Sequence, residues 1–115
     1  MTSRKFRFSS IGSGSKGNGL VIECGNTKVL VDCGFSLKES VRRLSARGIS
    51  PDSLDGIIVT HEHGDHIGGV EKLATKYNLP IFLTYGTSKM MSDSLDRFLI
   101  RDFSSFEIGD IFVVP

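Results

Sequence analysis

Residues 56–66 read GIIVTHEHGDH and carry most of the information about the architecture of this chain. The first part is a continuous apolar run rich in β-branched residues, which is typical of a β-strand buried on both faces. All three histidines of the chain follow this run within six positions, as His61, His63 and His66, interleaved with Asp65. The pattern therefore predicts a buried strand that leads directly into a cluster of metal-binding side chains.

The spacing of these side chains suits two metal ions. On an extended segment that leaves a strand, residues i and i+2 point to the same side, so His61 and His63 can bind one ion. Gly64 allows a sharp turn, after which Asp65 and His66 can face a second ion. Imidazole and carboxylate ligands suit Zn, Mn or Fe, among which the sequence does not choose. The alternative, that the histidines only decorate a polar loop, is disfavoured because two ligand-spaced pairs follow a buried strand.

The residues before this stretch predict the sheet around it. Residues 27–32, TKVLVD, read as a strand, and Ser36 begins a helix in which Glu39 is expected to complete a capping box. With the strand at 56–60 they form a βαβ unit, so the two strands should be parallel and share the edge at their carboxyl ends. Asp32 lies at this edge. It is either a carboxylate that fixes an imidazole or the loop backbone of the metal site, or a strand-end residue that only caps a turn.

The remaining apolar patterns predict further strands and helices. Apolar residues at i, i+3, i+4 and i+7 predict a helix from Val70 to Tyr77, and a weaker helical stretch covers residues 87–91. The other expected strands cover residues 6–11, 20–24, 81–84, 103–107 and 111–114.

A glycine-rich loop, GSGSKGNG at residues 12–19, joins the first two strands. It satisfies GxGxxG, but a dinucleotide-binding loop must open a helix, and residues 20–24 read as a strand. A Walker A site fails as well, because Lys16 precedes Gly17. The loop either presents polar groups to an anionic substrate, as a backbone nest would, or is a plain strand connection. The candidate substrate-binding side chains are Ser13, Ser15, Lys16 and Asn18.

Composition sets the outer limits. The chain has 115 residues and a mass of 12.6 kDa, the size of one domain. Lys plus Arg is 14 and Asp plus Glu is 13, which gives a net charge of +1, so any charged substrate must be held locally. No apolar run approaches the roughly 18 residues of a membrane helix, and the first residues lack the apolar stretch of a secretion signal. We therefore expect no membrane partner and a cytoplasmic location.

The cysteines and the basic residues are not interpreted as site residues. Cys24 and Cys33 form no CxxC, which excludes a zinc-ribbon spacing and favours free thiols. Cys33 lies beside the expected site as a candidate ligand or nucleophile, but a small buried side chain is favoured. The basic residues are interpreted as solvated surface; they are Arg4, Lys5, Arg7, Lys38, Arg42, Arg43 and Arg47.

Four stretches together resemble the metallo-β-lactamase superfamily, whose signature is HxHxDH after a buried strand. Within it they resemble a bacterial branch, the YycJ/WalJ-like cytoplasmic metallohydrolases linked to DNA processing. The stretches are SSIGSGSKGNG at 9–19, VLVDCG at 29–34, THEHGDHIGGV at 60–70 and FEIGDIFVVP at 106–115.

The resemblance implies an α+β fold, the four-layer αββα sandwich, of which residues 1–115 are the N-terminal half with a mixed β-sheet and helices on one face. It implies a metal-dependent hydrolase, with DNA or another phosphodiester as substrate. Two divalent ions are implied, Zn or alternatively Mn or Fe, one bound by His61 and His63 and the other by Asp65 and His66. A metal-activated water would attack, while Asp65 orients it or accepts its proton.

The family pattern also requires a third histidine for the first ion, a bridging aspartate and a final histidine. No histidine follows His66 in this sequence. We therefore expect the missing ligands to come from a C-terminal half beyond Pro115 or from a second chain in a homo-oligomer. The alternative function is a catalytically incomplete module that binds metal or a protein partner.

Overall fold

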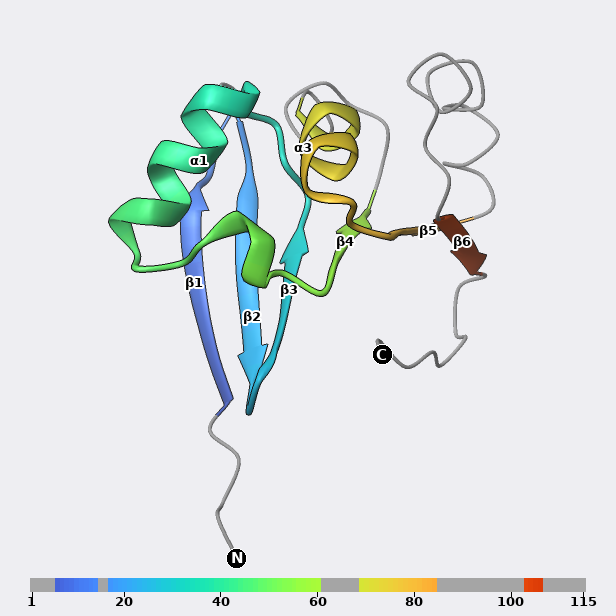
Figure 1. Cartoon of the computed structure of the whole chain (residues 1–115), viewed down its shortest axis with the longest axis horizontal. Helices are drawn as coiled ribbons and strands as arrows, with labels where there is room; N and C mark the ends of the chain where they lie inside the picture. The colour runs from blue at the N-terminus through green and yellow to red at the C-terminus, as the bar shows by residue number, and fades with distance from the viewer. Residues whose placement is uncertain (1–5, 15–16, 61–68, 85–102, 107–115) are drawn as a thin grey trace, which may run out of the picture.

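The computed structural model describes residues 6–14, 17–60, 69–84 and 103–106 (Figure 1). Within these residues six strands form one mixed sheet in sequence order, with β1 to β3 antiparallel and β3 to β6 parallel. The strands are β1 (Phe6–Gly12), β2 (Gly19–Cys24), β3 (Thr27–Val31), β4 (Gly56–Val59), β5 (Ile81–Thr84) and β6 (Phe103–Phe106).

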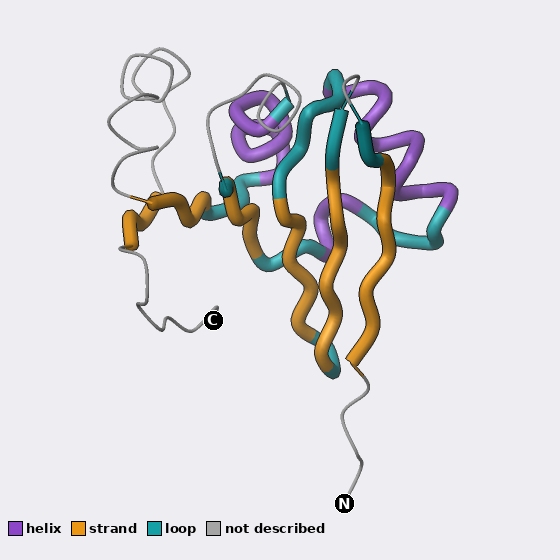
Figure 2. The backbone as a smooth tube through the Cα atoms, turned by 180° about the vertical axis from the view of Figure 1, so that it is seen from behind, coloured by secondary structure: helices purple, strands orange, loops and turns teal. Residues whose placement is uncertain are grey.

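Among the described residues, two α-helices and one short 3-10 helix connect the strands. They are α1 (Leu37–Ala46), η1 (Pro51–Ser53) and α3 (Val70–Tyr77). Both α-helices lie on one face of the sheet, as Figures 1 and 2 show from opposite sides. This confirms the predicted mixed sheet with helices on one face, and the predicted ranges agree with the observed bounds to within one residue. The helical stretch predicted at 87–91 and the strand predicted at 111–114 lie outside the described residues.

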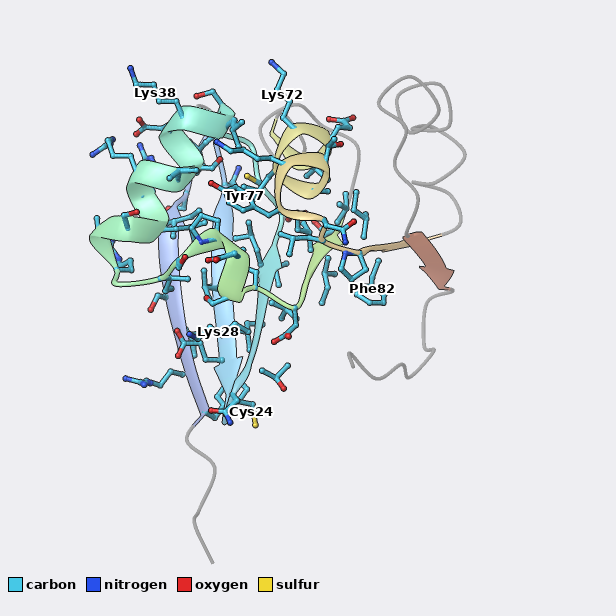
Figure 3. All side chains as sticks on the ribbon, viewed as in Figure 1. Cys24, Lys28, Lys38, Lys72, Tyr77 and Phe82 are labelled. Carbon is cyan, nitrogen blue, oxygen red and sulfur yellow. The ribbon has the colours of Figure 1, made fainter. Side chains whose placement is uncertain are left out.

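The core lies between the helices and the sheet. Alternate strand residues point toward the helices because side chains along a strand alternate between its two faces. Lys38 and Lys72 extend from the outer sides of α1 and α3 (Figure 3). The fully buried side chains from the strands are Val21, Leu30, Ile57, Val59 and Ile81, and those from the helices are Leu44, Val70 and Leu73.

The opposite face of the sheet is also apolar, and among the described residues no helix crosses it (Figure 2). We call it the open face. Phe6 and Phe8 project from it with 66% and 69% of their surface exposed. The strand register places on it Phe6, Phe8, Leu20, Ile22, Val29, Val31, Ile58 and Phe82.

The predicted capping box at the start of α1 is half right. The Ser36 hydroxyl accepts a hydrogen bond from the Glu39 backbone N–H at 3.2 Å, as expected for an N-cap. The prediction for the Glu39 side chain is wrong, because its carboxylate pairs with Arg42 and Arg43 instead. Two guanidinium groups at i+3 and i+4 offer charge-assisted bonds, which are stronger than one bond to a neutral backbone N–H.

Among the described residues, no helix has the length and the apolar composition that crossing a membrane would require.

Candidate metal centre

The topology brings the starts of three connecting segments to one edge of the sheet. Strands β1, β3 and β4 run in the same direction, because β1 and β3 are each antiparallel to β2, and β4 is parallel to β3. The arrowheads of β1 and β3 in Figure 1 point to this edge. The glycine-rich loop, the loop after β3 and the histidine segment all leave from it, so the predicted juxtaposition of Asp32 with the end of strand 56–60 is confirmed.

Asp32 joins the ends of β3 and β4. Its backbone N–H donates to the Ile58 carbonyl at 2.7 Å. Its carboxylate accepts two hydrogen bonds from Thr60, one from the backbone N–H at 2.8 Å and one from the hydroxyl at 2.6 Å. Only 6% of Asp32 is exposed, so water competes little for these bonds. Because Thr60 directly precedes His61, Asp32 holds the beginning of the histidine segment to the sheet.

The next residue in the chain holds the far end of that segment. The Cys33 carbonyl accepts a hydrogen bond from the Gly69 N–H at 2.9 Å, and Gly69 is the N-cap of α3. A Cβ on Gly69 would lie 2.0 Å from the Phe35 carbonyl oxygen, so this close approach requires glycine. Consecutive residues after β3 therefore anchor both ends of residues 61–68.

Cys33 has a packing role. Its side chain is fully buried, and its Sγ lies 3.0 Å from the Ser40 hydroxyl. Burial raises the pKa of the Cys33 thiol, which keeps it protonated and a poor nucleophile at neutral pH. Both cysteines are free thiols, as expected.

The glycine-rich loop is closed by Asn18. The Asn18 side-chain amide accepts from the Gly14 N–H at 3.1 Å and donates to the Gly14 carbonyl at 2.9 Å. The Asn18 carbonyl accepts from the Gly34 N–H at 3.0 Å, which ties this loop to the loop after β3. The Phe35 ring fills the space beside Gly17, where a Cβ would lie 2.5 Å from a ring atom. Ser13 is exposed.

Only some of the candidate residues fall within the described residues. Asp32, Ser13 and Asn18 do, and all three lie at the same edge of the sheet. The candidates outside the described residues are His61, His63, Asp65 and His66 of the metal site and Ser15 and Lys16 of the loop. Their donor chemistry, three imidazoles and one carboxylate, fits a borderline divalent ion such as Zn.

Sequence reasoning missed two anchoring residues, Thr60 and Gly69. A threonine at a strand end is common and gives no signal of its own. Glycine is the residue that allows a close approach of two backbones, but the sequence does not say which backbone Gly69 would meet.

The sequence of the chain is similar to those of known proteins. The model of the metallo-beta-lactamase superfamily matches residues 12–113, a range that contains the histidine segment. The chain is 39% identical over 108 residues to the exodeoxyribonuclease WalJ of Streptococcus pneumoniae, and 36% identical over 104 residues to the exodeoxyribonuclease YycJ of Bacillus anthracis. Each match covers 90% of this chain and 39% of the relative, so the chain spans well under half the length of these proteins.

The fold has solved counterparts. The Rm3 metallo-beta-lactamase superposes with a TM-score of 0.75 and 20% sequence identity, over 93% of this chain and 45% of that chain. The mixed sheet and the helices described above therefore have the fold of one part of that larger protein. Together with the match across residues 12–113, this likeness shows that the chain belongs to the metallo-beta-lactamase superfamily.

Proposed function

We propose that residues 1–115 are the N-terminal portion of a metal-dependent hydrolase that cleaves phosphodiester bonds in DNA in the cytoplasm. The observation that carries the proposal is the anchoring of residues 61–68 at both ends by Asp32 and Cys33. A segment rich in metal ligands gains affinity when its ends are fixed, because less conformational entropy is lost on binding. The two relatives named above, both exodeoxyribonucleases, support DNA as the substrate.

The proposed metal ligands are the four side chains of the HxHxDH motif. His61 and His63 would hold one divalent ion, and Asp65 and His66 a second, with Zn favoured over Mn or Fe. The chemistry supplied by such ions, when bound, is activation of water and neutralisation of charge on the phosphodiester. Asp65 would orient the attacking water or accept its proton.

Two protein ligands per ion are fewer than the three or four of known zinc sites. We propose that the remaining ligands come from residues outside this sequence, on a second sheet that covers the open face. The match to only 39% of each relative and the apolar character of the open face support this arrangement. A second copy of this chain is the alternative source.

The glycine-rich loop would contact the substrate. We propose that Ser13, Ser15 and Lys16 bind the anionic phosphodiester, because the loop leaves the sheet at the same edge as the histidine segment. Asn18 would act through the shape of the loop, since its amide is bonded to Gly14.

The test combines metal analysis with a nuclease assay. Mass spectrometry should find close to two metal ions per chain once the remaining ligands are supplied, by a longer protein or by a second copy of this chain, and this protein should cleave labelled DNA. His63→Ala and Asp65→Ala should each lose metal and cleavage, while the surface variant Lys76→Ala keeps both. Cleavage retained in His63→Ala would overturn the metal assignment. Tight binding of about one ion without hydrolysis would instead support a non-catalytic metal-binding module.

A further inference from the structure

Helix α1 concentrates positive charge in a nearly neutral chain. From Lys38 to its C-cap residue Arg47 the helix carries Lys38, Arg42, Arg43 and Arg47 against one acid, Glu39, which gives 4 − 1 = +3. The whole chain has a net charge of +1. The remainder of the chain is therefore slightly acidic, and α1 is its cationic side.

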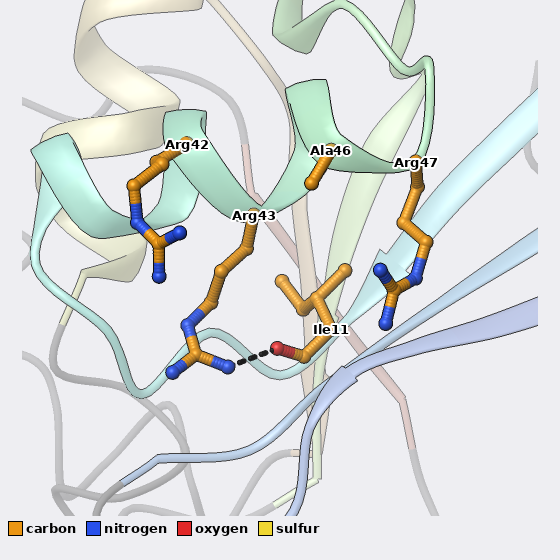
Figure 4. Close-up of a pocket in the computed structure, with 5 residues that line it drawn as sticks. All are labelled: Ile11, Arg42, Arg43, Ala46 and Arg47. Carbon is orange, nitrogen blue, oxygen red and sulfur yellow. Dashed lines mark hydrogen bonds between the residues drawn. The ribbon is translucent and has the colours of Figure 1, made fainter.

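The three arginines of this group line a pocket between α1 and the end of β1 (Figure 4). The pocket has a volume of about 170 Å³, and its lining residues are Ile11, Arg42, Arg43, Ala46 and Arg47. None of these lining residues is acidic. Figure 4 shows the three guanidinium groups extending from the same side of the helix toward β1.

Contacts with β1 and with Phe35 hold two of the arginines of the pocket in place. Arg43 donates from Nη1 to the Ile11 carbonyl at 2.6 Å, and its guanidinium lies 4.1 Å from the centre of the Phe35 ring. Arg47 donates to the Ser10 carbonyl at 3.3 Å. The interpretation of Arg43 as solvated surface is therefore wrong, because Phe35 and the β1 carbonyls provide partners from distant parts of the chain.

These contacts leave hydrogen-bonding capacity in the pocket. A guanidinium has five N–H donors, and Arg47 uses one of them in its hydrogen bond to the Ser10 carbonyl. Glu39 offsets one of the three positive charges by pairing with Arg42 and Arg43. Planar guanidinium groups that line a pocket with net positive charge can bind phosphate through two parallel N–H···O hydrogen bonds.

The pocket also lies near the edge of the sheet that carries the proposed metal centre. Ile11 is next to the last residue of β1, and β1 ends at the same edge of the sheet as Asp32 and Thr60. A polyanion held at the proposed metal centre could therefore continue past the end of β1 to α1.

We propose that this arginine pocket binds a backbone phosphate of a nucleic acid strand, independently of base sequence. The choice of nucleic acid rests on the proposed function, whereas the phosphate chemistry rests on the pocket alone. Contacts to phosphate fix the position of a strand but do not read bases.

The test is the binding of fluorescein-labelled oligothymidylate and oligoadenylate to the full chain in EDTA, followed by fluorescence anisotropy over a range of salt concentrations. The double variant Arg42→Gln, Arg47→Gln keeps Arg43 and its packing. It should weaken binding equally for both oligonucleotides. It should also reduce the slope of log K against log salt by about 0.7, the contribution of one neutralised single-strand phosphate.

The matched control removes two positive charges elsewhere, with Lys28→Gln and Lys76→Gln, and should change the slope by much less. Circular dichroism and urea unfolding verify that all variants fold. An equal loss in the control, or an unchanged slope in the arginine variant, would overturn the proposal. Binding of inorganic phosphate without any binding of oligonucleotide would also overturn it, in favour of a free-phosphate site.

The readout is separate from that of the proposed function. EDTA removes metal, so oligonucleotide binding does not require the metal centre. His63→Ala should lose cleavage and keep the wild-type dependence of oligonucleotide binding on salt. The arginine double variant should show a weaker dependence on salt and keep its metal content.

Discussion

Asp32 adopts a left-handed backbone conformation, with a φ of 62°, that non-glycine residues rarely occupy. The cost of this conformation is offset by the two hydrogen bonds that its carboxylate accepts from Thr60. A buried charged acceptor with two donors contributes more than a surface contact. The stability of the strand ends and the position of the histidine segment therefore depend on the same side chain.

Replacing Asp32 by alanine should thus affect both stability and metal binding. The variant loses both bonds and keeps a strained φ, so urea unfolding should show a loss of about 2–4 kcal/mol. Zinc affinity, measured by competition with a chromophoric chelator, should fall about 10- to 100-fold. The matched control is Asp55→Ala, because Asp55 accepts from the Lys28 N–H at 2.8 Å at the other end of the sheet. It should lower stability by about 1 kcal/mol and leave zinc affinity unchanged; equal effects on zinc would contradict the anchoring role.

Glu39 gives a pH prediction. Hydrogen bonds from Arg42, assisted by those from Arg43, lower the pKa of the Glu39 carboxyl from 4.5 to about 2. Because the folded pKa lies below the unfolded one, the stabilisation is complete above pH 4.5 and is lost as the pH falls toward about 2. An NMR titration of the carboxyl carbon should show the depressed pKa, and Arg42→Gln should raise it. Lys38→Gln is the control, and a pKa that ignores Arg42→Gln would contradict the pairing.

Helix α3 begins after its N-cap residue Gly69, where the backbone passes close to the Phe35 carbonyl. The Gly69 N–H donates to the Cys33 carbonyl, and the first residue of the helix follows directly. The helix then packs Val70 and Leu73 into the core. The position of the helix and the end of the histidine segment are therefore set by one glycine.

Gly69→Ala should be severely destabilising. The new Cβ meets a backbone atom that cannot move aside easily, so we expect a loss of about 3 kcal/mol or more in urea unfolding, together with weaker zinc binding. Gly48→Ala is the comparison, since a Cβ there meets open space and only the φ of 72° is strained. It should cost about 1–2 kcal/mol and leave zinc binding intact. Similar losses in both variants would show that the contact with Phe35 can relax.

The strands and helices follow from local pattern, which is why the sequence predicts their bounds well. Apolar periodicity gave the helix Val70–Tyr77, and βαβ topology gave the shared edge of Asp32 and Thr60. The roles of Glu39 and Arg43 were not predictable, because each depends on a competition between partners that only the folded chain brings together. The metal ligands remain a prediction from spacing.

The two faces of the sheet set the behaviour of the whole molecule. One face is covered by α1 and α3, and the apolar side chains that it contributes to the core are buried. On the open face Phe6 and Phe8 are exposed, whereas Val29 and Phe82 are buried. Exposed apolar rings that lie side by side are typical of a surface against which another surface packs. The same face is where the proposed second sheet would pack.

The isolated chain should therefore self-associate through the open face. Light scattering after gel filtration should show species larger than 12.6 kDa that grow with concentration. The double variant Phe6→Thr, Phe8→Thr removes the two exposed rings while keeping strand propensity, so it should shift the population toward the monomer. Arg7→Thr is the matched control, because Arg7 lies between them on β1 and points to the other side of the strand. If the wild-type chain stays monomeric at every concentration, or Arg7→Thr disperses it equally well, then the open face does not need a covering sheet, and the proposed source of the missing metal ligands loses its structural support.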